Sequence, residues 1–373
     1  MGVSTAADPS SSADSERRPA VSFLIPVYNA APYLRRCLDS AIGQTFRDIE
    51  VVCVDDGSTD GGPAILAEYA ARDPRIRVIS QKNHGALHAY SEAARAARGE
   101  YFLCLDADDR SRTGIVERAI AAAHRHGVDV VEFAVTERFS GLLHRPRHYY
   151  AWGSPRKDHI GKVLEQPDII QKSTYGEINC LLWNKLIRRE VFLAAIGDIP
   201  PEVRAKKISH RGDTLLCPIL LNRAKNYTAI ADIGCDYTRW KSSHTWLQRA
   251  DISGHLAMLD SFFLGLRTLH RILPPSLHPN LFEYYMYSSL DYIFQWKRFT
   301  RPQRLLAWQW LVDGFRFNER AHALFVGRVF GSKKILRAVT DNMRRRLPLA
   351  LCPWEWPGGL LRLLGRGIRL LRT

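Results

Sequence analysis

Three carboxylates stand within four residues, Asp106-Ala107-Asp108-Asp109, directly after an apolar run at residues 101–105. Like charges this close repel one another, which raises their pKa values and costs stability unless a positive charge lies between them. A divalent cation supplies that charge, and carboxylate oxygens suit Mg²⁺ or Mn²⁺. We therefore interpret Asp106 and Asp108 as candidate metal ligands. The alternative is a solvated acidic turn that caps a helix, since Asp is common at helix N-termini.

Three further polar clusters follow apolar runs in the same way. In an open parallel sheet, ligands bind outside the carboxyl ends of the strands, so all four clusters are expected at one edge. A carboxylate after the second run suits a base N–H or a ribose hydroxyl, whereas the alternative is an Asx-type turn that caps the next helix. The three clusters are Pro26-Val27-Tyr28-Asn29, Asp55-Asp56-Gly57-Ser58 and Gln81-Lys82-Asn83-His84-Gly85.

Short apolar runs alternate with helix-forming stretches in the first part of the chain. No run exceeds eight residues, which favours strands over helices. A strand–helix–strand repeat of about 25 to 30 residues has the size of a βαβ unit. The pattern predicts an α/β fold with a mostly parallel, doubly wound sheet and helices on both faces. The expected strands are residues 21–27, 49–54, 76–80, 101–105 and 128–135, and the expected helices are 34–42, 64–71, 86–97 and 115–126.

The rest of the sequence predicts a less regular middle and a mainly helical C-terminal region. Seven cysteines without a C-x-x-C pair, together with no apolar signal segment, fit a reducing cytosol. Further helices are expected at residues 178–187, 213–223, 252–272, 281–297, 303–315 and 333–346. The expected organisation is a disordered leader at 1–19, an α/β domain at 20–250, a helical domain at 251–346 and a basic tail at 347–373.

Positive charge is concentrated toward the end of the chain. The formal net charge is +15, from 53 Lys and Arg against 38 Asp and Glu, and residues 251–373 carry 19 of the basic and 8 of the acidic residues. Such a tail suggests an anionic surface as partner. In the segment LLRLLGRGIRLLRT at residues 360–373, the arginines recur at helical spacing opposite a leucine face. This pattern is typical of a helix at a membrane interface, and the alternative is a terminal helix docked on the domain.

Several common functions are disfavoured by what the sequence lacks. No G-x-G-x-x-G motif follows the first run and no P-loop motif is present, which argues against nicotinamide or flavin dinucleotides and against P-loop NTPases. No uninterrupted apolar run reaches the roughly 18 residues of a membrane-spanning helix. Because no nucleic-acid-binding motif accompanies the basic charge, no nucleic-acid partner is expected.

Six segments, in order, resemble family 2 glycosyltransferases of the GT-A (Rossmann-like) fold. They are SFLIPVYN, SAIGQTF, VVCVDDGSTDG, NHGALHA, RGEYFLCLDADD and LLWNKLIRREVF, and the resemblance covers residues 21–223. It implies inverting, metal-assisted transfer of a sugar from a nucleotide-diphosphate donor, with UDP favoured, to a glycan or polyprenyl-linked hydroxyl. The implied metal is Mn²⁺ or Mg²⁺. The implied role is in cell-surface polysaccharide synthesis. The implied location is the cytoplasm, with the protein peripheral on the inner face of the cell membrane.

The resemblance also assigns site residues. Its nucleotide-binding positions are Pro26, Tyr28, Asn29, Asp56, Asn83, Gly85 and Asp106. Pro26 and Tyr28 would cradle the base, and Asp56 would meet a uracil-like ring. Asn83 and Gly85 would border the nucleotide sugar. Asp106 would hold ribose and metal, while Asp108 would be the more direct metal ligand.

Asp213 matches the family's catalytic base, because it follows Trp183-Asn184-Lys185-Leu186 at the expected distance. Such a carboxylate would remove the acceptor hydroxyl's proton during attack, although Asp213 also suits a helix N-cap. Two departures stand out. Gly212 replaces the usual Glu, and Tyr90-Ser91 replaces an Arg-Asn pair near the donor phosphates or sugar. These departures keep a catalytically impaired nucleotide-binding scaffold as an alternative.

Four weaker candidates complete the set. Trp183 is expected either to stack on the acceptor sugar or to lie in the core. Lys185 is expected to meet a phosphate or to form a surface salt bridge. Arg239 and His244 are expected to close over the donor diphosphate or to lie in an ordinary exposed loop. Two other enzyme classes remain as alternatives: a phosphoglycerol or sugar-phosphate transferase of wall polymers, and a nucleotidyltransferase that releases pyrophosphate.

Overall fold

The chain divides into two compact units in the computed structural model, which describes residues 18–139, 154–208, 212–239, 252–279, 281, 300–315 and 317–319. The first unit comprises the chain up to residue 169, residues 181–207 and residues 223–239, and the second comprises the remainder. This division differs from the boundary expected near residue 250, because residues 170–180 and 208–222 belong to the second unit, and the expected domain bounds stay a prediction. The leader up to residue 17 and the whole tail lie outside the described residues.

A mixed sheet of nine strands forms the centre of the first unit, in the order β3-β2-β1-β4-β8-β6-β9-β5, with β7 paired to β9. Strands β3, β2, β1 and β4 are parallel neighbours, as are β6 and β9. Strand β8 runs antiparallel between β4 and β6. The strands are β1 Val21–Val27, β2 Ile49–Asp55, β3 Ile76–Ser80, β4 Tyr101–Cys104, β5 Arg110–Ser111, β6 Val130–Phe139, β7 Leu164–Glu165, β8 Lys185–Arg188 and β9 Asn226–Arg239.

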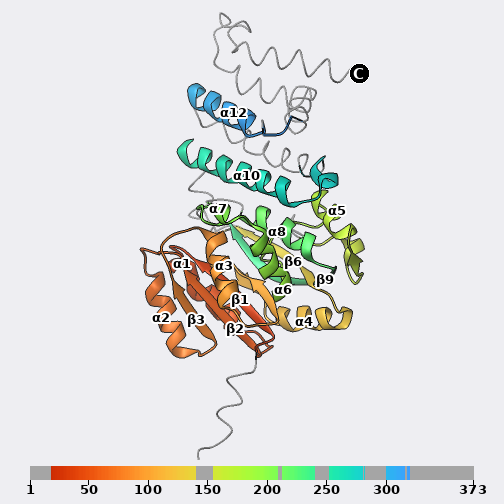
Figure 1. Ribbon diagram of the computed structural model, residues 1–373. Helices are drawn as coiled ribbons and strands as arrows, with labels where there is room; N and C mark the ends of the chain where they lie inside the picture. The colour runs from red at the N-terminus through yellow and green to blue at the C-terminus, as the bar shows by residue number, and fades with distance from the viewer. Residues whose placement is uncertain are drawn as a thin grey trace, which may run out of the picture. The chain divides into compact units, whose positions relative to one another are not determined.

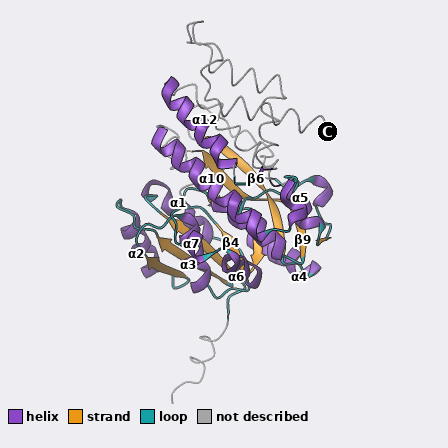
Figure 2. Ribbon diagram, turned by 45° about the horizontal axis from the view of Figure 1, so that its top comes forward, coloured by secondary structure: helices purple, strands orange, loops and turns teal. Residues whose placement is uncertain are grey.

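Helices cover both faces of this sheet (Figures 1 and 2), which confirms the expected fold class. Successive side chains of a strand point to opposite faces. Phe23 and Ile25 of β1 therefore join one core cluster with side chains of α1, α2 and α4. On the other face, Phe102 meets Phe192 of α6 edge to face, with ring centroids 5.5 Å apart. The helices of this unit are α1 Ala31–Ile42, α2 Gly62–Arg72, α3 Ala86–Ala96, α4 Ile115–His126, α6 Arg189–Asp198 and α7 Pro201–Arg204.

The helix expected at residues 178–187 is wrong. Its C-terminal part is strand β8, whose residues Lys185, Leu186 and Ile187 are buried between β4 and β6. A four-residue strand has too few positions to show a periodicity, so the apolar run at this place was open to either assignment. The segment is a strand because it pairs with β4 on one side and with β6 on the other.

The second unit is helical where it is described, as expected for the C-terminal region. Helices α8 Gly212–Arg223, α10 Ile252–Ile272 and α12 Arg301–Phe315 confirm three of the expected helices, and α5 Asp168–Thr174 adds a short one. Phe263 of α10 packs edge to face on Phe315 of α12, with ring centroids 5.1 Å apart. Residues 282–299 and 333–346 lie outside the described part. Among the described helices, none is both long and apolar enough to cross a membrane.

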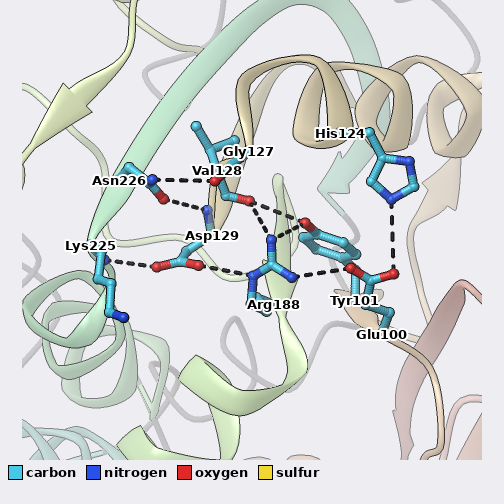
Figure 3. Close-up of polar contacts among 9 residues, drawn as sticks. All are labelled: Glu100, Tyr101, His124, Gly127, Val128, Asp129, Arg188, Lys225 and Asn226. Atoms are coloured by element: carbon cyan, nitrogen blue, oxygen red, sulfur yellow. Dashed lines mark hydrogen bonds and ion pairs between the residues drawn. The ribbon is translucent and has the colours of Figure 1, made fainter.

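A polar network joins four strands at the edge where β4 begins (Figure 3). Arg188, at the end of β8, bonds to Asp129 Oδ1 through Nε at 2.9 Å and to Glu100 Oε1 through Nη1 at 3.1 Å. Its Nη2 donates to the Tyr101 hydroxyl at 2.6 Å, and its guanidinium lies 4.8 Å from the Tyr101 ring centroid. Asp129 also accepts the backbone N–H of Lys225, just before β9, at 2.8 Å. The network therefore fixes the antiparallel strand at the edge opposite the polar clusters.

Candidate active site

The four polar clusters leave the sheet at one edge, as the sequence predicts. Val27 of β1 pairs with Asp55 of β2, which in turn pairs with Ser80 of β3. On the other side of β1, Leu24 pairs with Cys104 of β4. Because these four strands are parallel, the loops after them begin side by side at their carboxyl ends.

The first two loops are locked together by side chains. The Ser58 hydroxyl accepts the backbone N–H of Asn29 at 3.0 Å, and Asn29 Oδ1 accepts the N–H of Thr59 at 2.8 Å. Asp60 Oδ2 accepts the N–H of Ala31 at 2.9 Å. Asn29 has a φ of 49°, the left-handed conformation that Asn tolerates better than most residues. These bonds hold the loop after β1 in place, and nucleotide binding by Asn29 stays a prediction.

Tyr28 presents its ring at this edge. It is 40% exposed, one of the few large hydrophobic side chains that are. The Nζ of Lys207 lies 5.9 Å from its ring centroid, within cation–π range. Pro26 lies two residues earlier, in β1, and is partly buried. An exposed aromatic face of this kind offers a stacking surface for a nucleotide base.

Asp56 holds the loop that leads into α3. Its Oδ1 accepts from Gln81 Nε2 at 2.7 Å and from the backbone N–H of His84 at 2.8 Å, and its Oδ2 accepts the N–H of Gly85 at 2.8 Å. The residue is buried. A carboxylate has about four acceptor positions, so roughly one stays open for a ligand. The contact between Asp56 and a base stays a prediction, while its anchoring of the loop is a finding.

The loops after β2 and β3 approach each other closely at Gly57. Its φ is +74°, and a Cβ there would lie 2.9 Å from the backbone nitrogen of Asn83. Both features require glycine at this position. Asn83 Oδ1 is buried and has no hydrogen-bond partner among the described residues. Buried acceptors are rarely left unpaired, so this oxygen suits a ligand donor such as a sugar hydroxyl.

The three carboxyl groups after β4 lie close enough to repel. Burial raises the pKa of Asp106, against the opposing effect of a hydrogen bond from the Tyr90 hydroxyl at 2.6 Å. Burial, and then the charge of Asp106, raise the pKa of Asp108 to about 7. Burial, followed by the charges of Asp108 and Asp106, raises the pKa of Asp109 well above its usual value. A nearby cation would relieve this repulsion.

The chemistry of this cluster fits a divalent metal. Asp109 Oδ1 accepts the backbone N–H of Thr238 at 2.9 Å, while its Oδ2 is buried without a hydrogen-bond partner among the described residues. The nearest guanidinium, Arg36, donates through Nη2 to the backbone carbonyl of Asp108 at 2.6 Å and to the Thr238 hydroxyl at 3.2 Å. All the candidate ligands are oxygens, which suits Mg²⁺ or Mn²⁺.

The described part of the chain contains no preassembled group of three or more His, Cys, Asp or Glu ligands. Mg²⁺-type sites are commonly completed by water and substrate phosphates around one or two carboxylates. The residues that would hold such a cation here are Asp106 and Asp108.

Trp183 and Lys185 are buried in the fold. Trp183 stacks on Tyr237 with ring centroids 5.2 Å apart and belongs to the core. The Lys185 ammonium donates to the Leu181 carbonyl at 2.9 Å and lies 3.4 Å from Glu132 Oε2. Its side chain is 1% exposed. The expected phosphate contact and the expected surface salt bridge of Lys185 are therefore both corrected to a buried ion pair, and Trp183 follows its core alternative.

The remaining predicted residues lie elsewhere. Asp213 belongs to the second unit, in the first turn of α8, where its Oδ1 accepts the N–H of Thr214 at 2.9 Å. Its assignment as the base stays a prediction. Arg239 is the last residue of β9, and its side chain is outside the described part, as is all of His244.

Sequence reasoning missed the partners that hold the carboxylates. Arg36 contacts Asp108 and Thr238 contacts Asp109. Arg36 and Thr238 are also hydrogen-bonded to each other, although 202 positions of the sequence separate them. No spacing rule links positions this far apart. Tyr90 was singled out as a departure from the family pattern, but its bond to Asp106 carries no local sequence signal.

Comparisons with known proteins show similarity to glycosyltransferases. Residues 22–193 match the family described as Glycosyl transferase family 2. The chain is 33% identical over 177 residues to the uncharacterized glycosyltransferase EpsJ of Bacillus subtilis, which covers 47% of this chain and 49% of EpsJ. It is 48% identical over 106 residues to a chondroitin synthase of Escherichia coli, which covers 28% of this chain and 16% of that one. The alignments thus span about half the length of EpsJ and less of the synthase.

Among solved structures, the fold is similar to S. aureus TarS 1–349, with a TM-score of 0.58 at 19% identity over 87% of this chain and 89% of that one. The same fragment in complex with UDP-GlcNAc gives a TM-score of 0.57 over the same shares. These likenesses confirm the fold expected from the sequence.

Proposed function

Because residues 22–193 match the glycosyl transferase family 2 model, we propose that this chain transfers a sugar from a nucleotide-diphosphate donor to an acceptor hydroxyl with inversion at the anomeric carbon. The single observation that carries the proposal is the shared edge of β2 and β4. There, buried Asp56 fixes the loop into α3, and the repelling pair Asp106 and Asp108 is set to receive a cation.

The donor nucleotide is proposed to lie across the carboxyl ends of β1, β2 and β4. The exposed ring of Tyr28 offers stacking for the base. Asp56 keeps an acceptor position for a base N–H, and the unpaired Asn83 Oδ1 suits a hydroxyl of the donor. Uridine is the proposed base, since TarS, which has a similar fold, was solved with UDP-GlcNAc.

The proposed reaction needs a base for the acceptor and charge neutralisation for the leaving group. An acceptor hydroxyl is a poor nucleophile at neutral pH, so a carboxylate must take its proton as it attacks. Asp213 is the proposed base, on the family resemblance. A divalent metal held by Asp106 and Asp108 would offset the charge of the departing diphosphate. Tyr90 and Arg36 hold the loop of these carboxylates in place, at Asp106 Oδ1 and the Asp108 carbonyl.

The acceptor is proposed to be a growing glycan or a polyprenyl-linked saccharide in surface polysaccharide synthesis. Similarity to a chondroitin synthase supports the polysaccharide setting. The basic pattern at residues 360–373 supports a location at an anionic membrane surface.

Product analysis tests the proposal. The full chain is incubated with Mn²⁺ and a panel of UDP-, GDP- and dTDP-sugars, and the released nucleotide is separated by ion-exchange chromatography. Release of a nucleoside diphosphate, together with a β-linked product by NMR from an α-linked donor, is the expected result. Pyrophosphate release would indicate a nucleotidyltransferase, and a phosphodiester product would indicate a sugar-phosphate or phosphoglycerol transferase. Nucleotide binding without turnover of any donor would identify an impaired scaffold.

A further inference from the structure

Tyr90 connects the two ligand-binding aspartates through one helix. Its hydroxyl donates to Asp106 Oδ1 at 2.6 Å, and its side chain is 6% exposed. Tyr90 lies on α3, whose preceding loop is held by Asp56 through the backbone N–H groups of His84 and Gly85. Helix α3 is therefore held at its start by the Asp56 carboxylate and in its second turn by the Asp106 carboxylate.

The Tyr90 hydroxyl is a neutral donor in a place crowded with negative charge. Because an ionised carboxylate only accepts hydrogen bonds, the 2.6 Å contact with Asp106 Oδ1 makes the Tyr90 hydroxyl the donor. A neutral donor fixes one oxygen of Asp106 and leaves the net charge of the cluster unchanged. A cationic side chain at the same place would offset part of that charge.

We infer that Tyr90 is a positioning residue that orients Asp106 for a divalent cation while preserving the negative charge that attracts it. The inference rests on the proposed function, because it assumes that Asp106 and Asp108 hold the metal. Hydrogen-bond partners of metal ligands fix the orientation of those ligands, and their loss typically costs about 10- to 100-fold in metal affinity.

The fold offers a matched control in Tyr69. Its hydroxyl donates to Asp39 Oδ1 at 2.7 Å, and the residue is 4% exposed. This second tyrosine–aspartate bond joins α2 to α1, away from the four loops of the site, and its acceptor Asp39 is exposed. Tyr69→Phe therefore removes a hydrogen bond of similar length without touching the carboxylates after β4.

The test measures Mn²⁺ binding directly, by the electron paramagnetic resonance signal of free Mn²⁺, in the full chain with saturating UDP. Tyr90→Phe is expected to weaken Mn²⁺ binding about 10-fold or more, whereas Tyr69→Phe binds like the wild type. Tyr90→Lys is expected to weaken it further, because the added charge repels the cation. Tyr90→Gln restores a neutral donor and is expected to recover part of the affinity. Thermal unfolding is compared for Tyr90→Phe and Tyr69→Phe and is expected to show similar losses.

The outcomes separate this inference from the function on which it rests. Wild-type Mn²⁺ affinity in Tyr90→Phe, or an equal loss of Mn²⁺ affinity in Tyr90→Phe and Tyr69→Phe, overturns the role of Tyr90 while the metal site stands. Tighter Mn²⁺ binding in Tyr90→Lys does the same. Absence of Mn²⁺ binding in the wild type, with UDP present, overturns the metal-assisted function and the inference together. If Tyr90→Phe does not fold, Tyr90→Gln and Tyr90→Lys are compared instead. Weaker Mn²⁺ binding in Tyr90→Lys than in Tyr90→Gln supports the role of Tyr90, and equal or tighter binding overturns it.

Discussion

At the scale of single residues, the site holds carboxylates whose mutual repulsion a bound cation would relieve. Asp108 is partly buried beside Asp106 and Asp109, and its raised pKa shows that its charge is unfavourable in the folded chain. Gly57 holds a left-handed conformation where two loops almost touch. Such features are typical of functional sites, where stability is given up for binding.

Replacing Asp108 is expected to change activity and stability in opposite directions. Asp108→Asn keeps the side-chain volume but removes a repelling charge, so the metal-free protein should unfold at a higher temperature. Metal-dependent donor turnover should fall by more than the roughly 10- to 100-fold that loss of an outer partner costs. Differential scanning calorimetry and nucleotide release measure the two effects. A destabilised variant that keeps its turnover would contradict the role given to Asp108.

Gly57→Ala is expected to lower the free energy of unfolding by about 1–3 kcal/mol, because a Cβ there meets the Asn83 backbone and the φ of +74° is unfavourable for alanine. UDP binding should weaken as well, since the two loops border the proposed nucleotide site. Gly61→Ala is the control, because its Cβ would make an ordinary contact of 3.7 Å with the Ala31 Cβ. Urea unfolding of both variants measures the difference, and equal losses would count against the close approach at Gly57.

At the scale of elements, strand β8 shows what the sequence could predict and what it could not. The strands β1 to β4 and the polar clusters after them follow from short apolar runs and the rule for parallel sheets. Strand β8 could not be predicted in this way, because it is only four residues long and contains a buried lysine. The ion-pair partner of this Lys185 is Glu132, which lies in β6. Arg188 likewise draws its partners from two distant segments, residues 100–101 and 128–129. Pairings of this kind are decided by tertiary structure, and local pattern does not reveal them.

The Arg188 network gives a prediction at this scale. Arg188→Met is expected to lower the free energy of unfolding by about 2–4 kcal/mol, because it leaves the carboxylate of Asp129 without its partner in a half-buried place. Nucleotide affinity should stay unchanged, since the network lies at the opposite edge of the sheet. Arg223→Met removes an ion pair in which the arginine is 50% exposed, and about 1 kcal/mol or less is expected there. A small effect in Arg188→Met would show that other contacts hold β8.

At the scale of the whole molecule, charge is divided unevenly along the chain. Residues 251–373 carry 19 of the 53 basic residues but only 8 of the 38 acidic ones. A polar face of arginines beside a leucine face, at residues 360–373, is typical of segments that bind an anionic membrane. The membrane role of residues 360–373 is a prediction from their sequence pattern, because these residues lie outside the described part of the chain.

Liposome flotation tests the tail. The full chain is expected to float with vesicles that contain phosphatidylglycerol and not with purely phosphatidylcholine vesicles. Reversal of Arg362, Arg366, Arg369 and Arg372 to Glu should abolish flotation, because each arginine near the surface contributes about 1 kcal/mol. Equal flotation of the reversed and the native chain would refute the membrane role of the tail and leave the nucleotide site untouched.

The central claim is that the edge formed by β1, β2 and β4 binds a nucleoside diphosphate together with a divalent cation. Isothermal titration calorimetry of UDP into the full chain, once with Mn²⁺ and once with EDTA, tests this claim most directly. The account predicts binding to one site that is at least about 10-fold tighter with Mn²⁺, because the cation neutralises both the carboxylates and the diphosphate. Equal affinity in EDTA, or no binding of UDP or any other nucleoside diphosphate in either buffer, would contradict it.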